Sequence, residues 1–360
     1  MVSTTAEIPS SIDGVTPQWL TAALRADATT SGSAVVTDVH AEQIALDSGF
    51  SSLLYRIHLS GSADVPPTLI IKLPARSEAR GAMEVLGGYR RELSFYRDIA
   101  RHAPIETPHV FVARIADNST DFVLVMEDLQ GWENADHLAG LSLERARLCI
   151  GQLAGLHGWS VREPKTNVLE QFPSLDTPIT RELLHPAFGP GWQIYREKSG
   201  SPVPSAVAQY AERFVEHAGA ALAGLTERSM LLHGDIRADN MFFAGEALKV
   251  VDFQFTARGV GATDIGYLVS QGLPIEVRRG HDEDLVREYL ECLGQQGVTD
   301  YSFDDAWRHY RLAVAYLVVL PVITLNGWDA MPERSRALCL TLTDRAVATI
   351  DEIGALEVFE

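Results

Sequence analysis

The sequence predicts an α+β protein in which a small β-rich N-terminal lobe precedes a larger, mainly helical C-terminal lobe. Segments that alternate apolar and polar residues and favour β-branched side chains gather before residue 130. Beyond Glu127, apolar residues instead recur three and four positions apart, as in amphipathic helices. A chain of 360 residues with 46% apolar content can bury two cores. We expect residues 1–34 to form a helical extension, residues 35–128 the first lobe and residues 129–360 the second.

The N-terminal extension is predicted to contain one helix, and the first lobe to combine strands with a second. Thr16 and Pro17 fit an N-cap followed by proline at the first helical position, which predicts a helix over residues 18–25. Alternating or short apolar segments then predict strands, and a longer segment predicts a helix among them. The strands are residues 35–46, 52–59, 68–73, 110–116 and 121–126, and the second helix covers residues 82–102. We therefore expect a mostly antiparallel sheet with about five strands.

The second lobe is predicted to be helical apart from one short hairpin. Between residues 142 and 159, Ala146, Ile150, Leu153 and His157 follow the spacing of one helix face. Other segments repeat this spacing, and two short apolar segments near residue 245 fit paired strands. The helices are residues 142–159, 205–225, 281–296, 303–325 and 333–353, and the strands are residues 241–243 and 247–251.

The overall charge argues against polyanionic partners. The formal net charge is −18 at neutral pH. The phosphate backbone of a nucleic acid and the surface of an anionic membrane both repel such a chain. We therefore expect no nucleic acid and no membrane as the main partner, although local basic clusters could hold a small anion.

Cysteine usage and the N-terminus predict a cytoplasmic protein. Cys149, Cys292 and Cys339 lie far apart without metal-ligand spacing, so we expect buried, reduced thiols. The first residues lack the basic and apolar regions of an export signal. The longest apolar run, residues 312–325, is too short to span a membrane and contains Pro321.

Two short segments of the second lobe contain the most informative polar residues. They are His-Gly-Asp-Ile-Arg-Ala-Asp-Asn at residues 233–240 and Val-Val-Asp-Phe-Gln at residues 250–254. Asp235 and Asn240 precede one strand of the predicted hairpin, and Asp252 follows the other, so we expect the three side chains to converge. Two carboxylates and an amide oxygen suit Mg²⁺, which also binds phosphates. The set predicts phosphoryl transfer, which needs metal ligands and a carboxylate that orients the attacking hydroxyl.

These segments resemble the catalytic and metal-binding loops of the aminoglycoside phosphotransferase and choline kinase group, the small-molecule branch of the protein-kinase-like fold. Asp-Phe-Gln at residues 252–254, Gly-Phe-Ser-Ser-Leu-Leu-Tyr-Arg at residues 49–56 and Met-Glu-Asp-Leu at residues 126–129 most resemble its ecdysteroid kinase-like subfamily. The similarity covers residues 43 to 325 or so. It implies a two-lobed kinase-like fold and an enzyme that uses ATP and Mg²⁺ to phosphorylate a hydroxyl group of a small molecule.

The resemblance implies a role for each residue of the catalytic set. Asp235 is expected to orient the acceptor hydroxyl or accept its proton. Asn240 is expected to bind one Mg²⁺, and Asp252 to bridge Mg²⁺ to the β- and γ-phosphates. Alone, either aspartate could be a turn or capping residue, and it is the triplet that favours the functional interpretation.

Three neighbours are expected to support this set. His233 would pack and hydrogen-bond around the loop, and Asp264 would brace the loop from below. Arg237 would either neutralise a phosphate or pair with Asp239, and the sequence leaves both alternatives open.

Lys72 ends an apolar strand and matches the lysine that steadies the α- and β-phosphates in this group. Glu92 matches the helix glutamate that pairs with it, because a nearby carboxylate keeps a lysine charged and directed. Two alternatives remain open. Lys72 could be an ordinary lysine of an edge strand, and Glu84, on the same predicted helix, could take the place of Glu92.

Two backbone segments complete the expected nucleotide site. A serine-rich turn is expected to cradle phosphate through backbone amides and hydroxyls, although its single glycine also fits a plain β-turn. This turn comprises Ser48, Gly49, Phe50, Ser51 and Ser52. A hinge is expected to hold the adenine through backbone groups, and it comprises Glu127, Asp128 and Leu129.

The acceptor pocket is expected from residues 160–215 and 305–330. Aromatic residues are common in and beside these segments, and they either line a pocket or belong to a helical core. They are Trp159, Phe172, Phe188, Trp192, Tyr195, Tyr210, Trp307, Tyr310, Tyr316 and Trp328. An aromatic pocket favours a lipophilic alcohol of terpenoid, steroid or aromatic type.

Other functions stay open at this point. The acceptor could be an aminoglycoside, a macrolide or a choline-type cation, which an aromatic cage would hold. A function of another class would be a nucleotide-binding pseudokinase or regulatory module, and the intact Asp235, Asn240 and Asp252 argue against it. The chain could act as a monomer or a homodimer.

Overall fold

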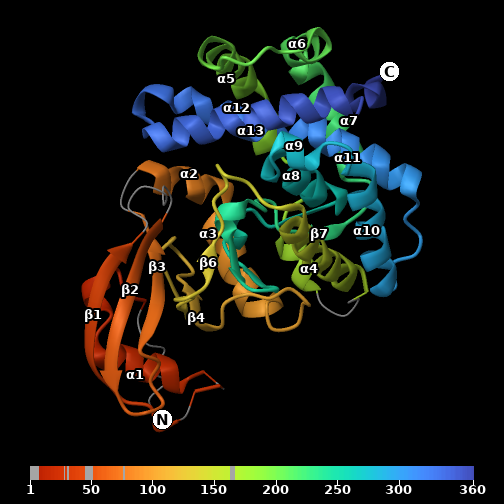
Figure 1. The fold of residues 1–360 in the computed structure, drawn as a ribbon. Coiled ribbons are helices and arrows are strands. Elements are labelled where there is room, and N and C mark those ends of the chain that lie inside the picture. The colour runs from red at the N-terminus through yellow and green to blue at the C-terminus, as the bar shows by residue number, and fades with distance from the viewer. Residues whose placement is uncertain (1–7, 28, 31, 45–51, 76–77, 163–166) are drawn as a thin grey trace. The chain divides into compact units, whose positions relative to one another are not determined.

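The chain folds into two compact units, each with its own core. A computed structural model describes residues 8–27, 29–30, 32–44, 52–75, 78–162 and 167–360. The first unit comprises Met1–His102 and Thr107–Trp132, and the second comprises Ala103–Glu106 and Glu133–Glu360. The first unit is built on a sheet and the second is mostly helical (Figure 1). The predicted α+β class is confirmed.

The first unit contains one antiparallel five-stranded sheet. Its strands lie in the order β1-β2-β3-β5-β4, and every neighbouring pair is antiparallel. The predicted strands are all present, with shifted ends. They are β1 (Val36–Ile44), β2 (Ser52–Gly61), β3 (Thr68–Pro74), β4 (Val110–Ile115) and β5 (Phe122–Glu127).

Helix α1 (Pro17–Arg25) covers one face of this sheet. Thr16 caps it, because its hydroxyl accepts a hydrogen bond from Trp19 N at 3.2 Å. The apolar side of α1, with Leu20 and Leu24, packs on sheet residues that alternate along their strands, among them Ile57, Leu69, Ile71, Val123 and Val125. Because side chains alternate along a strand, Lys72 lies on the opposite face of β3 from Ile71.

The helical segment predicted over residues 82–102 is interrupted. Gly87 adopts a left-handed conformation with φ 69° and separates α2 (Glu78–Leu86) from α3 (Gly88–Ser94). A single π-helical turn, Phe95–Ile99, follows α3 directly. Glycine takes positive φ without steric cost, so the break falls at this residue. As a result Glu92 belongs to a separate short helix that packs on the sheet at β4.

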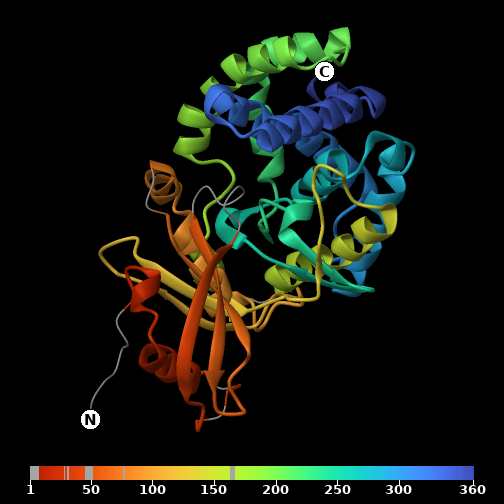
Figure 2. The ribbon, with the colours of Figure 1, turned by 60° about the vertical axis from the view of Figure 1, so that its left-hand side comes forward.

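The second unit is a helical assembly with short strands. The predicted hairpin is present, and its strands pair with a third, short strand. The strands are β6 (Glu133–Asn134), β7 (Met230–Leu232), β8 (Met241–Ala244), β9 (Ala247–Val250) and β10 (Ala257–Gly259). The helices are α4 (Leu143–Arg162), α5 (His185–Lys198), α6 (Ser205–Glu212), α7 (Phe214–Leu225), α8 (Ala262–Gly272), α9 (Ile275–Arg278), α10 (Asp282–Gln295), α11 (Phe303–Leu317), α12 (Val319–Thr324) and α13 (Glu333–Glu352). Within this unit α13 lies along α12 and packs on α8 (Figure 2).

The helix predicted over residues 303–325 is divided near Pro321. Proline has no amide hydrogen, so it cannot bond to the carbonyl of Leu317, four residues earlier. The side-chain amide of Gln271 donates to this carbonyl instead, at 3.0 Å. The span Phe303–Ala330 is long and apolar enough to cross a membrane, but 61% of its most apolar window is buried inside the protein, as in a core helix.

Candidate active site

The loop at residues 233–240 is joined directly to the segment that contains Asp252. It connects β7 to the β8–β9 hairpin. The backbone amide of Val251 donates to the carbonyl oxygen of Asn240 at 3.0 Å, just beyond the end of the hairpin. Asp252 is therefore the residue next to the backbone partner of Asn240. The hairpin thus places the backbone of the loop that contains Asp235 and Asn240 beside the segment that contains Asp252, as its pattern predicted.

Asp264 at the start of α8 holds the loop from behind. Its two carboxylate oxygens accept the backbone amides of His233 at 2.7 Å and Gly234 at 3.0 Å, and His157 Nε2 lies 3.2 Å from the carboxylate. Burial opposes ionisation of Asp264, but the hydrogen bonds from His157 and Gly234 keep its pKa below the usual value. Gly234 has a φ of 80°, and a Cβ there would lie 2.2 Å from the carbonyl oxygen of Phe255. The loop can take this course only with glycine at that position.

The side chain of Asp235 is buried and held by three neighbours. The amide nitrogen of Asn240 donates to the backbone oxygen of Asp235 at 2.8 Å and lies 3.4 Å from its carboxylate. Arg237 Nε lies 3.0 Å from Asp235 Oδ1, and the hydroxyl of Tyr267 also bonds to this carboxylate. The charge of Asp235 is the main reason why the pKa of Arg237 is raised. The ion pair that Arg237 forms is thus with Asp235 rather than Asp239.

Asp252 adopts a backbone conformation that is unfavourable for its residue type. Its φ of 68° is the one positive value of a non-glycine residue in the described part of the chain. Such a conformation costs about 1–3 kcal/mol and is found mostly at functional sites. The carboxylate accepts the side-chain amide of Gln254 at 3.2 Å. His233 fixes the preceding residue, since its Nε2 lies 3.1 Å from the carbonyl oxygen of Val251.

The donor atoms of this site fit a hard divalent cation. The Asn240 amide nitrogen is directed at Asp235, so its Oδ1 is the atom that remains for coordination. With the carboxylate of Asp252 it supplies the oxygen ligands that Mg²⁺ prefers. Among the described residues no group of three or more His, Cys, Asp or Glu could hold a metal ion. An ion here would therefore depend on the amide oxygen and on oxygen atoms of a bound phosphate.

Lys72 and Glu92 form a buried ion pair in the first unit. Lys72 Nζ lies 2.7 Å from Glu92 Oε1, and the two side chains are 8% and 1% exposed. Glu84, the alternative partner, belongs to α2 and instead contacts Arg80 at 2.8 Å and the hydroxyl of Thr120. The structure thus pairs Lys72 with Glu92.

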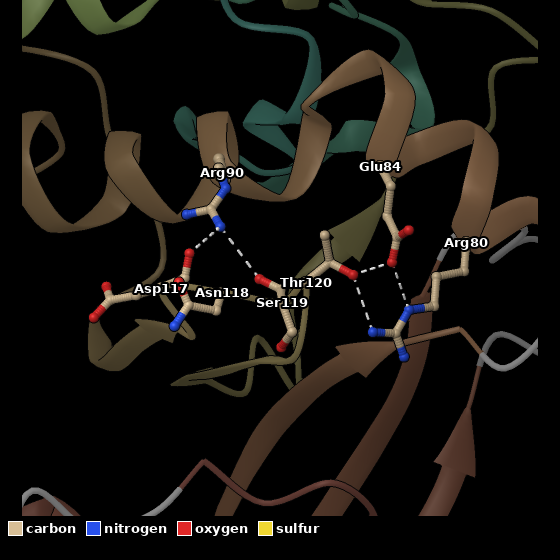
Figure 3. A pocket seen from close by; sticks show the side chains of 7 residues that line it. All are labelled: Arg80, Glu84, Arg90, Asp117, Asn118, Ser119 and Thr120. Carbon is tan, nitrogen blue, oxygen red and sulfur yellow. Dashed lines mark hydrogen bonds and ion pairs between the residues drawn. The ribbon is translucent and has the colours of Figure 1, made fainter.

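Glu84 lines a cavity that is separate from this ion pair. The cavity has a volume of about 510 Å³ and is lined by Arg80, Glu84, Arg90, Asp117, Asn118, Ser119 and Thr120. In Figure 3 Glu84 points toward Arg80 and Thr120, and Arg90 points toward the turn at residues 117–119. Arg90 donates to the backbone carbonyls of Ala116, Asp117 and Ser119. Residues of the predicted nucleotide site do not line it.

Replacing Glu92 with glutamine is expected to destabilise the protein by about 3 kcal/mol, because removing one partner leaves the other charge buried without compensation. Urea unfolding of the variant measures this change. Glu84→Gln is the matched control, because its ion pair is exposed, and it should leave the free energy of unfolding close to that of the wild type. Equal stability of the two variants would show that the Lys72–Glu92 pair is not buried as described.

The hinge residues are held through their side chains. Asp128 forms a two-pronged ion pair with Arg56, at 2.7 and 3.1 Å. Glu127 accepts the backbone amide of His109 at 2.9 Å. These contacts fix the end of β5.

The predicted phosphate loop falls mostly outside the described residues. This holds for Ser48, Gly49, Phe50 and Ser51. Ser52 is described as the first residue of β2. Its side chain is buried, and its hydroxyl has no hydrogen-bond partner in the described part of the chain.

Most of the aromatic residues considered for the acceptor pocket are buried in the second unit. Phe188 stacks on Phe214 with ring centroids 3.9 Å apart and on Trp192 at 5.9 Å. The fully or nearly fully buried residues are Phe172, Phe188, Trp192, Tyr195, Tyr210, Tyr310 and Tyr316. The core interpretation therefore applies to these seven, and aromatic content alone does not identify an acceptor.

Two residues near the catalytic loop were not identified from the sequence. Tyr267 lies three residues after Asp264 on α8, so both side chains face the same side of the helix. That spacing is a signal from which Tyr267 could have been found. His137, which contacts the amide of Ala238, lies in an irregular segment without any such signal.

Solved structures of kinases share this fold. Choline kinase from Cryptosporidium parvum Iowa II is 12% identical, with a TM-score of 0.57 over 89% of this chain and 94% of that chain. Ethanolamine kinase from Plasmodium vivax is 10% identical, with a TM-score of 0.55 over 86% and 82%. Wild-type aminoglycoside 2′-phosphotransferase-IIIa in complex with GDP is 15% identical, with a TM-score of 0.54 over 87% and 93%. At such identities the likeness establishes a kinase-like fold and nothing further.

The family of the chain follows from its sequence. Among curated proteins, none matches it. The Ecdysteroid kinase-like family, in contrast, matches residues 47–297, which is more than half of the chain. The chain therefore belongs to the Ecdysteroid kinase-like family and is a small-molecule kinase.

Proposed function

We propose that the protein transfers the γ-phosphoryl group of ATP to a hydroxyl group of a small organic molecule. The observation that carries this proposal is the bond between Val251 and Asn240, which ties the loop of Asp235 to the strained residue Asp252. Two carboxylates and an amide oxygen held in this way match the needs of phosphoryl transfer. The buried pair of Lys72 and Glu92 supports the same reaction from the first unit.

Each residue has a defined task in this proposal. Asp235 orients the acceptor hydroxyl and accepts its proton, while Arg237 and Tyr267 fix the direction of its carboxylate. Asn240 and Asp252 hold Mg²⁺, which when bound supplies neutralisation of phosphate charge. Catalysis is then a matter of positioning and electrostatics, without a covalent enzyme intermediate.

Lys72 contacts the α- and β-phosphates in this proposal, and Glu92 keeps its ammonium group charged and directed. The backbone of the hinge, Glu127, Asp128 and Leu129, holds the adenine. Ser52 contributes a hydroxyl whose hydrogen-bonding capacity is not used within the described residues.

The acceptor that we propose is a lipophilic alcohol of terpenoid, steroid or aromatic type. The family takes its name from ecdysteroid kinases, and an ecdysteroid is a steroid.

Release of ADP from Mg-ATP across a panel of acceptors tests the proposal, with Asp235→Asn as the blank. The panel contains steroid and terpenoid alcohols, aromatic alcohols, choline, ethanolamine, aminoglycosides and macrolides. Turnover that depends on Asp235 with the first three groups is the expected result. Turnover with choline or an antibiotic would overturn the acceptor class but keep the reaction. Binding of Mg-ATP without turnover of any acceptor would favour a nucleotide-binding regulatory module.

A further inference from the structure

The loop that contains Asp235 and Asn240 begins a 3₁₀ turn at Ala238, and the start of such a turn has an amide hydrogen without a partner inside the turn. A residue far away in the sequence supplies that partner. His137 Nδ1 accepts the hydrogen bond of the Ala238 amide at 3.0 Å. In return the His137 amide donates to Asp239 Oδ1 at 2.9 Å. The two segments thus satisfy each other reciprocally, in the manner of a capping box.

The segment around His137 is itself held on both sides. The side-chain amide of Asn134 donates to the carbonyls of Asp239 at 2.9 Å and Met241 at 3.1 Å. Arg345 on α13 is 5% exposed, and it donates to the carbonyl of His137 at 2.9 Å and to those of Leu138, Ala139 and Gln271. A chain of hydrogen bonds therefore leads from α13 through residues 137–139 to the catalytic loop.

Within the described residues the imidazole of His137 makes one hydrogen bond, which its Nδ1 accepts from the Ala238 amide. It is 1% exposed, and its Nε2 is buried there without a hydrogen-bond partner. Burial lowers the pKa of His137 well below the usual value, and the charges of Arg237 and Arg345 act in the same direction. The ring is therefore neutral, with its proton on Nε2 and with Nδ1 as the acceptor. A buried N–H without a partner costs free energy, so packing alone does not explain a histidine at this position.

We propose that His137 is a positioning residue that sets the place of the catalytic loop through the bond from the Ala238 amide to its Nδ1. This hydrogen bond holds Ala238, which lies between Asp235 and Asn240, so it fixes the positions of both side chains. The consequence for turnover rests on the proposed phosphotransfer function. A displacement of about 1 Å can cost roughly 100-fold in rate, even when its origin lies away from the reacting groups.

Three substitutions at one position test this role. The Oδ1 atom of asparagine takes about the place of Nδ1 and can accept the same hydrogen bond, whereas the amide of glutamine reaches to about the place of Nε2. His137→Ala and His137→Gln are expected to lower kcat about 10- to 100-fold, with a smaller change in KM for Mg-ATP. His137→Asn is expected to recover most of the loss. His309→Ala is the matched control, because it removes another buried imidazole of the same unit, which contacts Tyr301 and Glu227 instead.

Amide hydrogen exchange over residues 235–241 gives a readout that does not depend on turnover. Exchange should be faster in His137→Ala and His137→Gln than in the wild type and His137→Asn. An asparagine variant no better than the glutamine variant, in both kcat and exchange, would overturn the proposal, as would wild-type values in all three. If the wild type turns over no acceptor, the proposed function fails by itself, and the comparison of exchange rates still decides whether His137 positions the loop.

Discussion

The Asp235→Asn variant is expected to bind Mg-ATP with nearly unchanged affinity and to lose turnover by about 10²- to 10⁴-fold, the range for removal of a general base. Asparagine has the same shape but cannot accept the proton of the acceptor hydroxyl. The side chain keeps an oxygen that can face Arg237, 3.0 Å away in the wild type. Turnover is measured as ADP release under saturating nucleotide, and binding by isothermal titration calorimetry.

A variant of Asp264 shows whether a loss of turnover comes from the missing catalytic group or from a disturbed loop. Asp264 accepts the amides of His233 and Gly234, so Asp264→Asn should lower the midpoint of thermal unfolding. Asp235→Asn should lower it less, because its partner Arg237 is 31% exposed and can be solvated when the ion pair is lost. Full turnover in Asp235→Asn would contradict the role of Asp235. A large loss of thermal stability in that variant would mean that its carboxylate serves the fold.

Substitution of Asp252 is expected to abolish Mg²⁺-dependent nucleotide binding, with a loss of affinity beyond about 100-fold, since changes even in groups around a metal ligand cost 10- to 100-fold. Asparagine is the informative replacement. It tolerates the left-handed conformation at φ 68°, whereas alanine adds backbone strain. Nucleotide binding is followed as the shift in unfolding temperature with ATP, in the presence of Mg²⁺ or EDTA.

Asp284→Asn, on the exposed side of α10, is the neutral control for this experiment. It should keep the Mg²⁺-dependent shift of the wild type. If Asp252→Asn and Asp252→Ala both retain that shift, Asp252 is not a metal ligand. If only the alanine variant loses it, the backbone conformation of Asp252 matters more than its charge.

The sequence predicted the parts of the fold that depend on local patterns. The short apolar run at residues 68–73 identified β3, the strand that contains Lys72, and the hairpin pattern near residue 245 brought Asn240 next to the segment of Asp252. Both are short-range consequences of residue order. The pairing of Lys72 with Glu92 was also favoured, although the sequence left Glu84 as an alternative. The break at Gly87 separates these two glutamates into different helices, and a single helix had been expected there.

Features that depend on tertiary packing could not be predicted. Helix α5 contains Gly189 and Pro190 in its interior, which argue against a helix locally, so its stability comes from packing of Phe188 and Trp192 in the core. The contact of His137 with the catalytic loop and that of Arg345 with His137 each join residues that are about a hundred or more positions apart. No periodicity or motif marks such a contact in advance.

The hydrogen bonds of Arg345 have a consequence for the order in which the protein matures. The ribosome completes the catalytic loop long before it reaches Arg345, and at about 5–20 residues per second the interval lasts several seconds or more. During this time residues 137–139 lack the donor that later holds their carbonyls. A nascent chain arrested before α13 should therefore contain every residue of the proposed catalytic set and still be inactive. Activity would thus appear only after synthesis of the last long helix.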